Sequence, residues 1–223
     1  MFEELKGNSS DYDLDKVKPI KNSPLKGLSF LFLGSSVTIG FKSCEVSFPE
    51  YLSKRNGFEY VKEAVSGTTL TDGNESYIER LRKLKTAKSF DFLVCQLSTN
   101  DAYCQRNFGT ISESFSIEDF DTSTIYGAIE YIISYAKTRL NARVVFYTSP
   151  YYENEHYKKM VQGLLAIQKK WKIGVIDMYS DPYFNKLDIE KRELYMADPI
   201  HPTKAGYLEW ITPYMEKHLY QMI

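Results

Sequence analysis

The chain has 223 residues, of which 43% are hydrophobic and 15% aromatic, and this composition can bury one sizeable core in a single domain. Its 28 lysine and arginine residues nearly balance its 29 aspartate and glutamate residues. This balance excludes a global field that would draw the protein to nucleic acid or to an anionic membrane, so we expect a small or weakly charged partner.

Residues 1–25 are polar with scattered apolar side chains, and they predict an arm that lies over the domain or is partly disordered. This start lacks the basic residues and the apolar run of a secretory signal, and no segment approaches the roughly 20 apolar residues of a membrane helix. The three cysteines are an odd number without metal-ligand spacing. These features predict a reduced, cytoplasmic protein with one folded domain over residues 26–223.

From residue 28 onward, short β-rich apolar runs alternate with longer segments that carry apolar residues at helical spacing. The predicted strands cover residues 28–33, 59–65, 90–97, 142–148 and 174–178. The predicted helices cover residues 49–54, 76–84, 123–140, 155–171 and 204–220. The alternation predicts an α/β fold, a three-layer α/β/α sandwich with helices on both faces of a mainly parallel five-stranded sheet.

Residues 101–122 break this rhythm, because the segment is too long for a routine connection between two elements. Its aromatic side chains are Tyr103, Phe108, Phe115 and Phe120. Tyr151 and Tyr152 follow the fourth predicted strand in the same way. All six side chains are equally compatible with a stacking surface for a sugar, a wall for a short acyl chain, or ordinary packing.

Polar residues that directly follow strands are the first candidates for a site, because ligands of an open parallel sheet bind beyond the carboxyl ends of its strands. Small and amide-bearing residues follow the first three predicted strands, in the stretches GSSVTIG, VSGTTL and LSTND. A fourth stretch, ADPIHPTKAGY, precedes the last predicted helix and places Asp198 three residues before His201. This spacing allows the carboxylate to orient one imidazole nitrogen while the other faces the cleft, as a serine nucleophile requires.

These four stretches resemble the sequence blocks of the SGNH, or GDSL-like, hydrolase superfamily, in the same order and over about residues 28–210. The matching residues are Phe32, Gly34, Ser36, Thr38 and Gly40 in the first block, Gly67 in the second, Asn100 in the third, and Asp198, His201 and Pro202 in the last. Two positions differ from the family pattern, because Ser35 replaces an aspartate and Ser98 replaces a glycine. The alignment of the first block places Ser36, and not Ser35, at the position of the nucleophile.

The resemblance implies a flavodoxin-like fold and a serine hydrolase that cleaves carboxylic esters through an acyl-enzyme on Ser36. It implies that His201 accepts the serine proton and that Asp198 holds the imidazole in its productive tautomer. The implied oxyanion donors are the backbone N–H groups of Ser36 and Gly67 and the side-chain amide of Asn100. No phosphate-binding loop, His-Glu-x-x-His pattern or calcium loop occurs, so we expect no cofactor and no metal.

Taken singly, each of these residues also fits a simpler structural role. Ser36 alone is typical of a helix cap, and Gly67 and Asn100 alone are typical of turns. Asp198 and His201 alone fit the start of the final helix. We favour the catalytic interpretation because all four stretches occur together, in order, at predicted strand ends.

Three further residues with reactive side chains lie outside this pattern. We expect His156 and His218 at the surface, and we expect Cys104 either to line the pocket or to be a small buried or half-buried thiol.

Two classes of function remain open at this point. The first is a serine esterase acting on acyl or acetyl esters of a carbohydrate, lipid or small molecule, with an acyltransferase that uses the same triad as a close variant. The second is a non-catalytic module that binds a ligand in the same cleft. The fold and the triad do not choose the substrate, and the free edges of the sheet leave a homodimer open.

Overall fold

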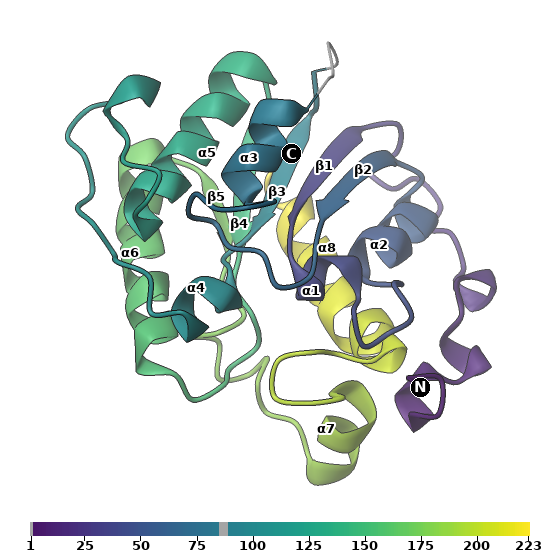
Figure 1. The fold of residues 1–223 in the computed structure, drawn as a ribbon. Coiled ribbons are helices and arrows are strands. Elements are labelled where there is room, and N and C mark those ends of the chain that lie inside the picture. Colours follow the sequence, from purple (N-terminus) through teal and green to yellow (C-terminus); the bar gives the residue numbers. More distant parts are fainter. Residues whose placement is uncertain (1, 85–88) are drawn as a thin grey trace.

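The computed structural model describes residues 2–84 and 89–223, so Met1 of the predicted arm lies outside the described residues. The described chain forms a five-stranded parallel sheet in the order β2-β1-β3-β4-β5 (Figure 1). The strands are β1 (Ser29–Gly34), β2 (Glu59–Ala64), β3 (Phe92–Gln96), β4 (Arg143–Tyr147) and β5 (Gly174–Ile176). Each of them overlaps a predicted strand, and the predicted α/β class is confirmed.

Helices cover both faces of this sheet (Figure 1). The α-helices are α1 (Ser36–Ile39), α2 (Phe48–Asn56), α3 (Tyr77–Lys83), α4 (Thr99–Tyr103), α5 (Ile125–Arg139), α6 (Glu155–Trp171), α7 (Ile189–Tyr195) and α8 (Thr212–Tyr220). The predicted ranges 49–54, 76–84, 123–140 and 155–171 correspond to α2, α3, α5 and α6. The range 204–220 corresponds to a continuous helical segment that ends in α8.

The three central strands β1, β3 and β4 read as apolar runs because both of their faces are buried, whereas the edge strand β2 is partly exposed and carries charged residues. Successive side chains of a strand point to opposite faces. Leu31 and Leu33 of β1 therefore pack into a core shared with α3, α5 and α6, whereas Phe30 and Phe32 pack into a core shared with α2 and α8. The sheet is thereby fixed between two apolar layers, and its polar loops are confined to the edges.

The strand order creates a crevice at one of those edges. From β1 the chain goes to β2 on one side, and it returns to β3 on the other side of β1. Ligands of such sheets bind where the order switches direction. Ser36 lies two residues after β1 and Asn100 lies four residues after β3, so the topology alone places these two residues beyond neighbouring strand ends.

The hydrophobic pattern does not predict three short helices, α1, α4 and α7. The prediction of a connecting segment over residues 101–122 is wrong at its start, because residues 101–103 belong to α4. The cause is a capping interaction, in which Ser98 Oγ accepts hydrogen bonds from the N–H groups of Asn100 at 3.1 Å and Asp101 at 3.3 Å. Ser98, one of the two departures from the family pattern, therefore begins this helix.

The last helical segment is also less regular than its pattern predicts. A π-helical stretch, Gly206–Ile211, precedes α8. Pro213 lies in the first turn of α8 and has no N–H to donate to the preceding turn, so the helix cannot keep its regular hydrogen bonding there. No helix among the described residues is long and apolar enough to cross a membrane.

The N-terminal residues lie over the domain in short 3₁₀ turns, which cover Lys6–Asn8, Ser10–Tyr12 and Leu14–Lys16. The Asn8 side-chain amide donates to the carbonyl of Lys42 at 2.7 Å and accepts from the N–H of Lys204 at 2.9 Å. The ammonium group of Lys204 also pairs with Asp13 at 2.6 Å. These contacts join the arm to the segment after α1 and to the residues just after His201.

Candidate active site

The predicted nucleophile, base and orienting acid lie in direct contact. Ser36 begins α1 at the carboxyl end of β1, and its Oγ lies 2.9 Å from Nε2 of His201. Nδ1 of His201 lies 2.8 Å from Oδ2 and 3.0 Å from Oδ1 of Asp198. The three side chains form one hydrogen-bonded chain from hydroxyl to imidazole to carboxylate, which is the geometry of a base-activated serine.

The two adjacent serines have different surroundings. The Ser36 hydroxyl meets the imidazole, whereas Ser35 is fully buried and its hydroxyl has no hydrogen-bond partner among the described residues. The backbone groups of Ser35 are bonded, because its N–H donates to the side chain of Gln96 at 3.0 Å and its carbonyl accepts from the N–H of Ile39 at 2.9 Å. The geometry therefore agrees with the assignment of Ser36, and not Ser35, to the nucleophile position.

A buried polar network holds the turn that carries the two serines. Gln96 Oε1 accepts from the N–H of Ser35 and from the hydroxyl of Thr38 at 2.8 Å, and Tyr147 OH lies 2.6 Å from the same hydroxyl. A Cβ at position 34 would overlap Thr38 Oγ1, so the close approach requires Gly34. Sequence analysis missed Gln96 and Tyr147, whose only signal is a polar group at the end of an apolar strand.

The loop that carries His201 and Asp198 is closed on itself. Asp198 Oδ1 accepts from the backbone N–H groups of Ile200 and His201, both at 2.8 Å, and Ala197 N–H donates to the carbonyl of His201 at 2.9 Å. Burial opposes ionisation of Asp198, but the N–H of Ile200 and the ring and N–H of His201 outweigh it, so the pKa of Asp198 is lowered. In the imidazole tautomer that donates Nδ1–H to the carboxylate, Nε2 is available to accept a proton.

Of the three predicted oxyanion donors, Ser36 and Asn100 line the cavity at the nucleophile, whereas Gly67 is not among its lining residues. Ser36 is the first residue of α1, where a backbone N–H has no partner within its own helix. Gly67 is exposed with φ of +80°, and a Cβ there would meet no atom within 4 Å, so conformation and not crowding favours glycine. The Asn100 side-chain amide donates to the carbonyl of Thr68 at 2.8 Å, which joins the second and third sequence blocks.

Asp101 is a fully buried carboxylate beside Asn100 that sequence analysis did not single out. Its Oδ2 accepts from the N–H of Leu70 at 2.7 Å, and its Oδ1 accepts from the N–H of Thr71 at 3.2 Å and the Thr71 hydroxyl at 2.9 Å. Burial raises the pKa of Asp101 against the effect of these hydrogen bonds. Asp101 thus anchors the loop that follows Gly67, and its only sequence signal is its place beside Asn100.

A cavity of about 210 Å³ opens at the triad. Ser36, Asn100 and His201 line it, together with Tyr103 and Tyr152. A larger groove of about 600 Å³ lies beside it, with Tyr152 in both walls and Met196, Asp198 and Pro199 along the groove. The site therefore has a small compartment at the nucleophile and a wider one next to the histidine loop.

The aromatic side chains with undecided roles separate into two groups. Tyr103, which is 86% exposed, and Tyr152 line the cavity at Ser36, and Tyr151 lines the wider groove. The other three pack away from this cavity, with Phe108 against His156 and both Phe115 and Phe120 against Trp171. Only one of the four aromatic side chains in residues 101–122 therefore reaches the site.

The remaining candidate side chains do not join the site. His156 and His218 are half-buried and lie against the carbonyls of Arg106 and Tyr214, at 2.9 and 2.8 Å, instead of standing free at the surface. Cys104 is exposed just after α4 and does not line the cavity, so both expectations for it are wrong. Within residues 2–84 and 89–223, no three His, Cys, Asp or Glu side chains are grouped to hold a metal ion.

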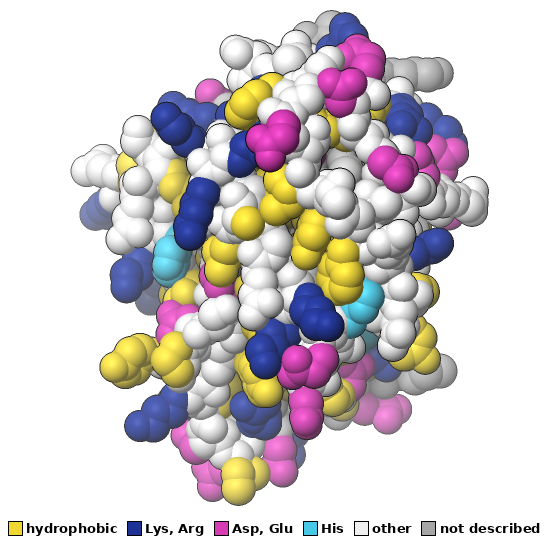
Figure 2. Space-filling view, turned by 90° about the vertical axis from the view of Figure 1, so that its left-hand side faces the viewer, with side chains coloured by type: hydrophobic (Ala, Val, Ile, Leu, Met, Phe, Trp, Pro, Cys, Tyr) yellow, Lys and Arg dark blue, Asp and Glu magenta, His cyan; other side chains and the backbone are white. Residues whose placement is uncertain are grey.

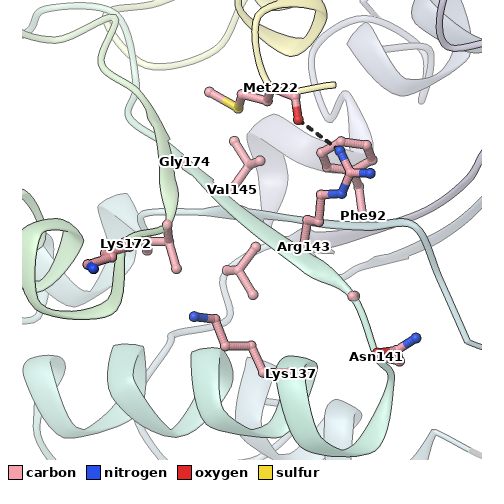
Figure 3. A pocket seen from close by; sticks show the side chains of 11 residues that line it. Phe92, Lys137, Asn141, Arg143, Val145, Lys172, Gly174 and Met222 are labelled. Carbon is pink, nitrogen blue, oxygen red and sulfur yellow. Dashed lines mark hydrogen bonds between the residues drawn. The ribbon is translucent and has the colours of Figure 1, made fainter.

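Another cavity of about 560 Å³ lies at the opposite edge of the sheet, at the amino ends of β4 and β5 (Figure 3). In it Arg143 donates to the carbonyl of Met222 at 2.9 Å, and Lys137 donates to the carbonyl of Trp171 at 2.9 Å. No residue of the triad lines this cavity. It is therefore separate from the candidate active site.

Residues 32–208 match the GDSL-like Lipase/Acylhydrolase family, a range that holds every residue of the triad and all three candidate donors. The chain belongs to this family. A search of curated proteins found no match to this GDSL-like hydrolase. Family membership assigns it in general to the hydrolases that act on ester bonds.

Solved structures of low sequence identity share the fold of this GDSL-like hydrolase. A protein from Lactobacillus plantarum is 16% identical with a TM-score of 0.72, over 89% of this chain and 99% of that one. A possible lipase from Chitinophaga pinensis is 17% identical with a TM-score of 0.66, over 87% and 98%. The psychrotrophic esterase EstA from Pseudoalteromonas sp., which is inhibited by monoethylphosphonate, is 16% identical with a TM-score of 0.60, over 87% and 97%.

The surface charge of this GDSL-like hydrolase is mixed on the face that Figure 2 shows. Lysine and arginine side chains alternate there with aspartate and glutamate, and neither sign gathers into one wide patch. This distribution agrees with the formal net charge of −1. It gives no field on that face for a highly charged polymer.

Proposed function

We propose that this GDSL-like hydrolase cleaves carboxylic esters through an acyl-enzyme on Ser36. The observation that carries the proposal is the 2.9 Å contact of Ser36 Oγ with Nε2 of His201, whose other nitrogen is held by Asp198. His201 takes the serine proton as Oγ attacks the ester carbonyl, and it then protonates the departing alcohol. A water molecule repeats the sequence on the acyl-enzyme and releases the acid.

The negative charge that develops on the carbonyl oxygen requires donors placed before the reaction begins. We assign this role to the N–H groups of Ser36 and Gly67 and to the side-chain amide of Asn100. The free N–H at the start of α1, the exposed backbone at Gly67 and the link from Asn100 to Thr68 support the assignment.

The two compartments of the site favour a small acyl group on a larger alcohol. The alcohol departs on the side of His201, because the imidazolium must reach its oxygen. The groove of about 600 Å³ follows Met196, Asp198 and Pro199 of the histidine loop. The cavity of about 210 Å³ at Ser36 is walled by Tyr103 and Tyr152 and has room for a short acyl chain. We therefore propose acetyl or short-chain acyl esters of a bulky alcohol, such as a sugar, as substrates.

The first experiment compares hydrolysis of p-nitrophenyl acetate, butyrate and octanoate by the wild type, Ser36→Ala and Ser35→Ala. The wild type is expected to prefer the acetate or butyrate, Ser36→Ala to be inactive, and Ser35→Ala to keep most of its activity. Ser35→Ala is a matched control because it removes a neighbouring hydroxyl that has no partner among the described residues. Equal activity of Ser36→Ala and the wild type would contradict the proposal.

Covalent labelling separates an enzyme from a non-catalytic binding module. A fluorophosphonate probe is expected to modify Ser36 of the wild type and of Ser35→Ala, as located by peptide mass spectrometry, because only an activated serine reacts. The inhibition of the structurally similar EstA by a phosphonate supports this choice of probe. An unlabelled and inactive wild type would favour the binding module, whereas formation of new esters with added alcohols would favour an acyltransferase.

A further inference from the structure

Arg80 is a buried cation for which the proposed mechanism gives no role. It lies in α3 with 9% of its surface exposed, and no carboxylate of a described residue lies within ion-pair distance of it. Its guanidinium instead lies 5.2 Å from the ring centroid of Tyr77, and its Nε has no partner among the described residues. Arginine is seldom buried without an acidic partner, because removal of its charge from water is costly.

The hydrogen bonds of Arg80 reach both sides of the oxyanion site. Nη2 donates to the carbonyl of Gly34 at 2.7 Å, and Nη1 donates to the hydroxyl of Thr68 at 3.3 Å. Gly34 lies two residues before Ser36, and Thr68 directly follows Gly67. The carbonyl of Thr68 in turn accepts the side-chain amide of Asn100. One side chain from α3 is thus connected to the segments of all three proposed donors.

We propose that Arg80 is a positioning residue that aligns the three oxyanion donors and places a buried positive charge behind them. This inference rests on the proposed function. A cation in a poorly solvated interior interacts more strongly with a developing oxyanion than with a neutral ester, so it lowers the barrier without tightening substrate binding. Ser35 adds no compensating negative charge to the turn after Gly34, where the family pattern has an aspartate.

The test compares Arg80→Met and Arg80→Lys with Arg82→Met. Arg82 lies on the same helix, but its guanidinium is solvent-exposed and pairs with Asp72 at 3.1 Å. Arg82→Met therefore controls for the loss of an arginine from α3. For each variant, kcat and KM for p-nitrophenyl acetate and the rate of fluorophosphonate labelling are measured, and folding is checked by circular dichroism and thermal unfolding.

Arg80→Met is expected to lower kcat and the labelling rate by about ten- to a hundredfold, with KM changed less than about twofold. Arg80→Lys is expected to recover part of the loss, because the ammonium group keeps the charge but not the two-pronged hydrogen bonding. Arg82→Met is expected to keep kcat within about twofold of the wild type. A merely structural role for Arg80 would not confine the loss to kcat and the labelling rate.

Three results would overturn the inference: a folded Arg80→Met variant with wild-type kcat, a loss that appears in KM, or an equal loss in Arg82→Met. If Arg80→Met does not fold, Arg80→Lys carries the test, and a kcat equal to that of the wild type then refutes the role. Failure of the proposed function is distinguishable, because the wild type itself would then be inactive and unlabelled.

Discussion

Both edges of the sheet carry a cavity, but they differ in what their polar groups bind. At the carboxyl edge, Ser36 and His201 line a cavity of about 210 Å³, and the Ser36 hydroxyl, the His201 imidazole and the Asp198 carboxylate bind one another. At the amino edge, a cavity of about 560 Å³ is lined by Arg143, which donates to the carbonyl of Met222 (Figure 3), and by Lys137, which donates to the carbonyl of Trp171. The smaller cavity is the candidate active site, because reactive groups that converge indicate chemistry better than volume does.

The direction of the chain explains this difference. After a parallel strand, the chain enters a helix at its amino end, so free N–H groups and small polar residues collect at the carboxyl edge of the sheet. At the opposite edge the helices end, and cations are favoured near their free carbonyl groups. Basic residues do occupy the last turns of α5 and α6. Lys137 and Arg143 donate to carbonyls at or just after the ends of α6 and α8, which accounts for these two cations at the amino edge.

The largest effect is expected at the carboxyl edge, where Ser36, His201 and Asp198 are proposed to act as a unit. His201→Ala is expected to lower kcat/KM for p-nitrophenyl acetate by at least about 10⁴-fold. The double variant Ser36→Ala/His201→Ala is expected to be no less active than either single variant, because each alone stops the nucleophile. Steady-state kinetics on the two single variants and the double variant test this expectation. If the loss of activity in the double variant equalled the combined losses of the single variants, the two residues would act separately.

Removal of one oxyanion donor is expected to have the next largest effect. Asn100→Ala is expected to lower kcat by about 100- to 1,000-fold with little change in KM, because the amide acts on the charge of the transition state. Asn107→Ala is the matched control, since Asn107 lies in the connecting segment and does not line the cavity at Ser36. A loss of similar size in both variants would remove Asn100 from the oxyanion site.

The preference of the enzyme for short or long acyl chains tests whether the small cavity at Ser36 holds the acyl group. Tyr103→Ala is expected to raise the ratio of octanoate to acetate hydrolysis several-fold, because it removes an exposed wall of the small cavity. Phe115→Ala is the control, because Phe115 packs against Trp171 and lies outside that cavity. An unchanged ratio in Tyr103→Ala would place the acyl chain elsewhere.

The hydrogen bonds of Asp198 predict a pH dependence of stability. Because its folded-state pKa is lowered, ionised Asp198 stabilises the folded state above the ordinary carboxyl pKa, and this contribution is lost as the pH falls through the lowered value. The stability difference between wild type and Asp198→Asn should therefore be larger at about pH 7 than at about pH 3. Urea unfolding of both proteins at both pH values measures this difference in the free energy of unfolding. A difference that is larger in acid than at neutral pH would contradict the lowered pKa of Asp198.

The smallest effect is expected at the amino edge. Arg143→Met removes the hydrogen bond to the Met222 carbonyl but no group near Ser36, so kcat/KM for p-nitrophenyl acetate should stay within about twofold of the wild type. Steady-state kinetics at matched protein concentration test this. A tenfold loss, by contrast, would show that the two edges of the sheet are functionally coupled.

Local pattern was sufficient for the strands and for most helices. Apolar runs mark the buried strands whatever they pack against, and Asp198 and His201 are three residues apart, so a single turn brings the pair together. Two short helices, α4 and α7, begin at capping residues whose signal is weaker than any hydrophobic period. For that reason the boundary of residues 101–122 was misplaced.

Contacts between distant residues belong to the tertiary structure alone. Arg80 reaches Gly34 across 46 residues, and Gln96 reaches Ser35 across 61. Tertiary contacts also separate the aromatic side chains of residues 101–122. Tyr103 lies at the cavity, whereas the others pack against side chains outside it, namely Phe108, Phe115 and Phe120. A sequence pattern shows which residues are apolar or reactive, but the packing of sheet and helices decides which of them meet, because those contacts depend on the whole fold.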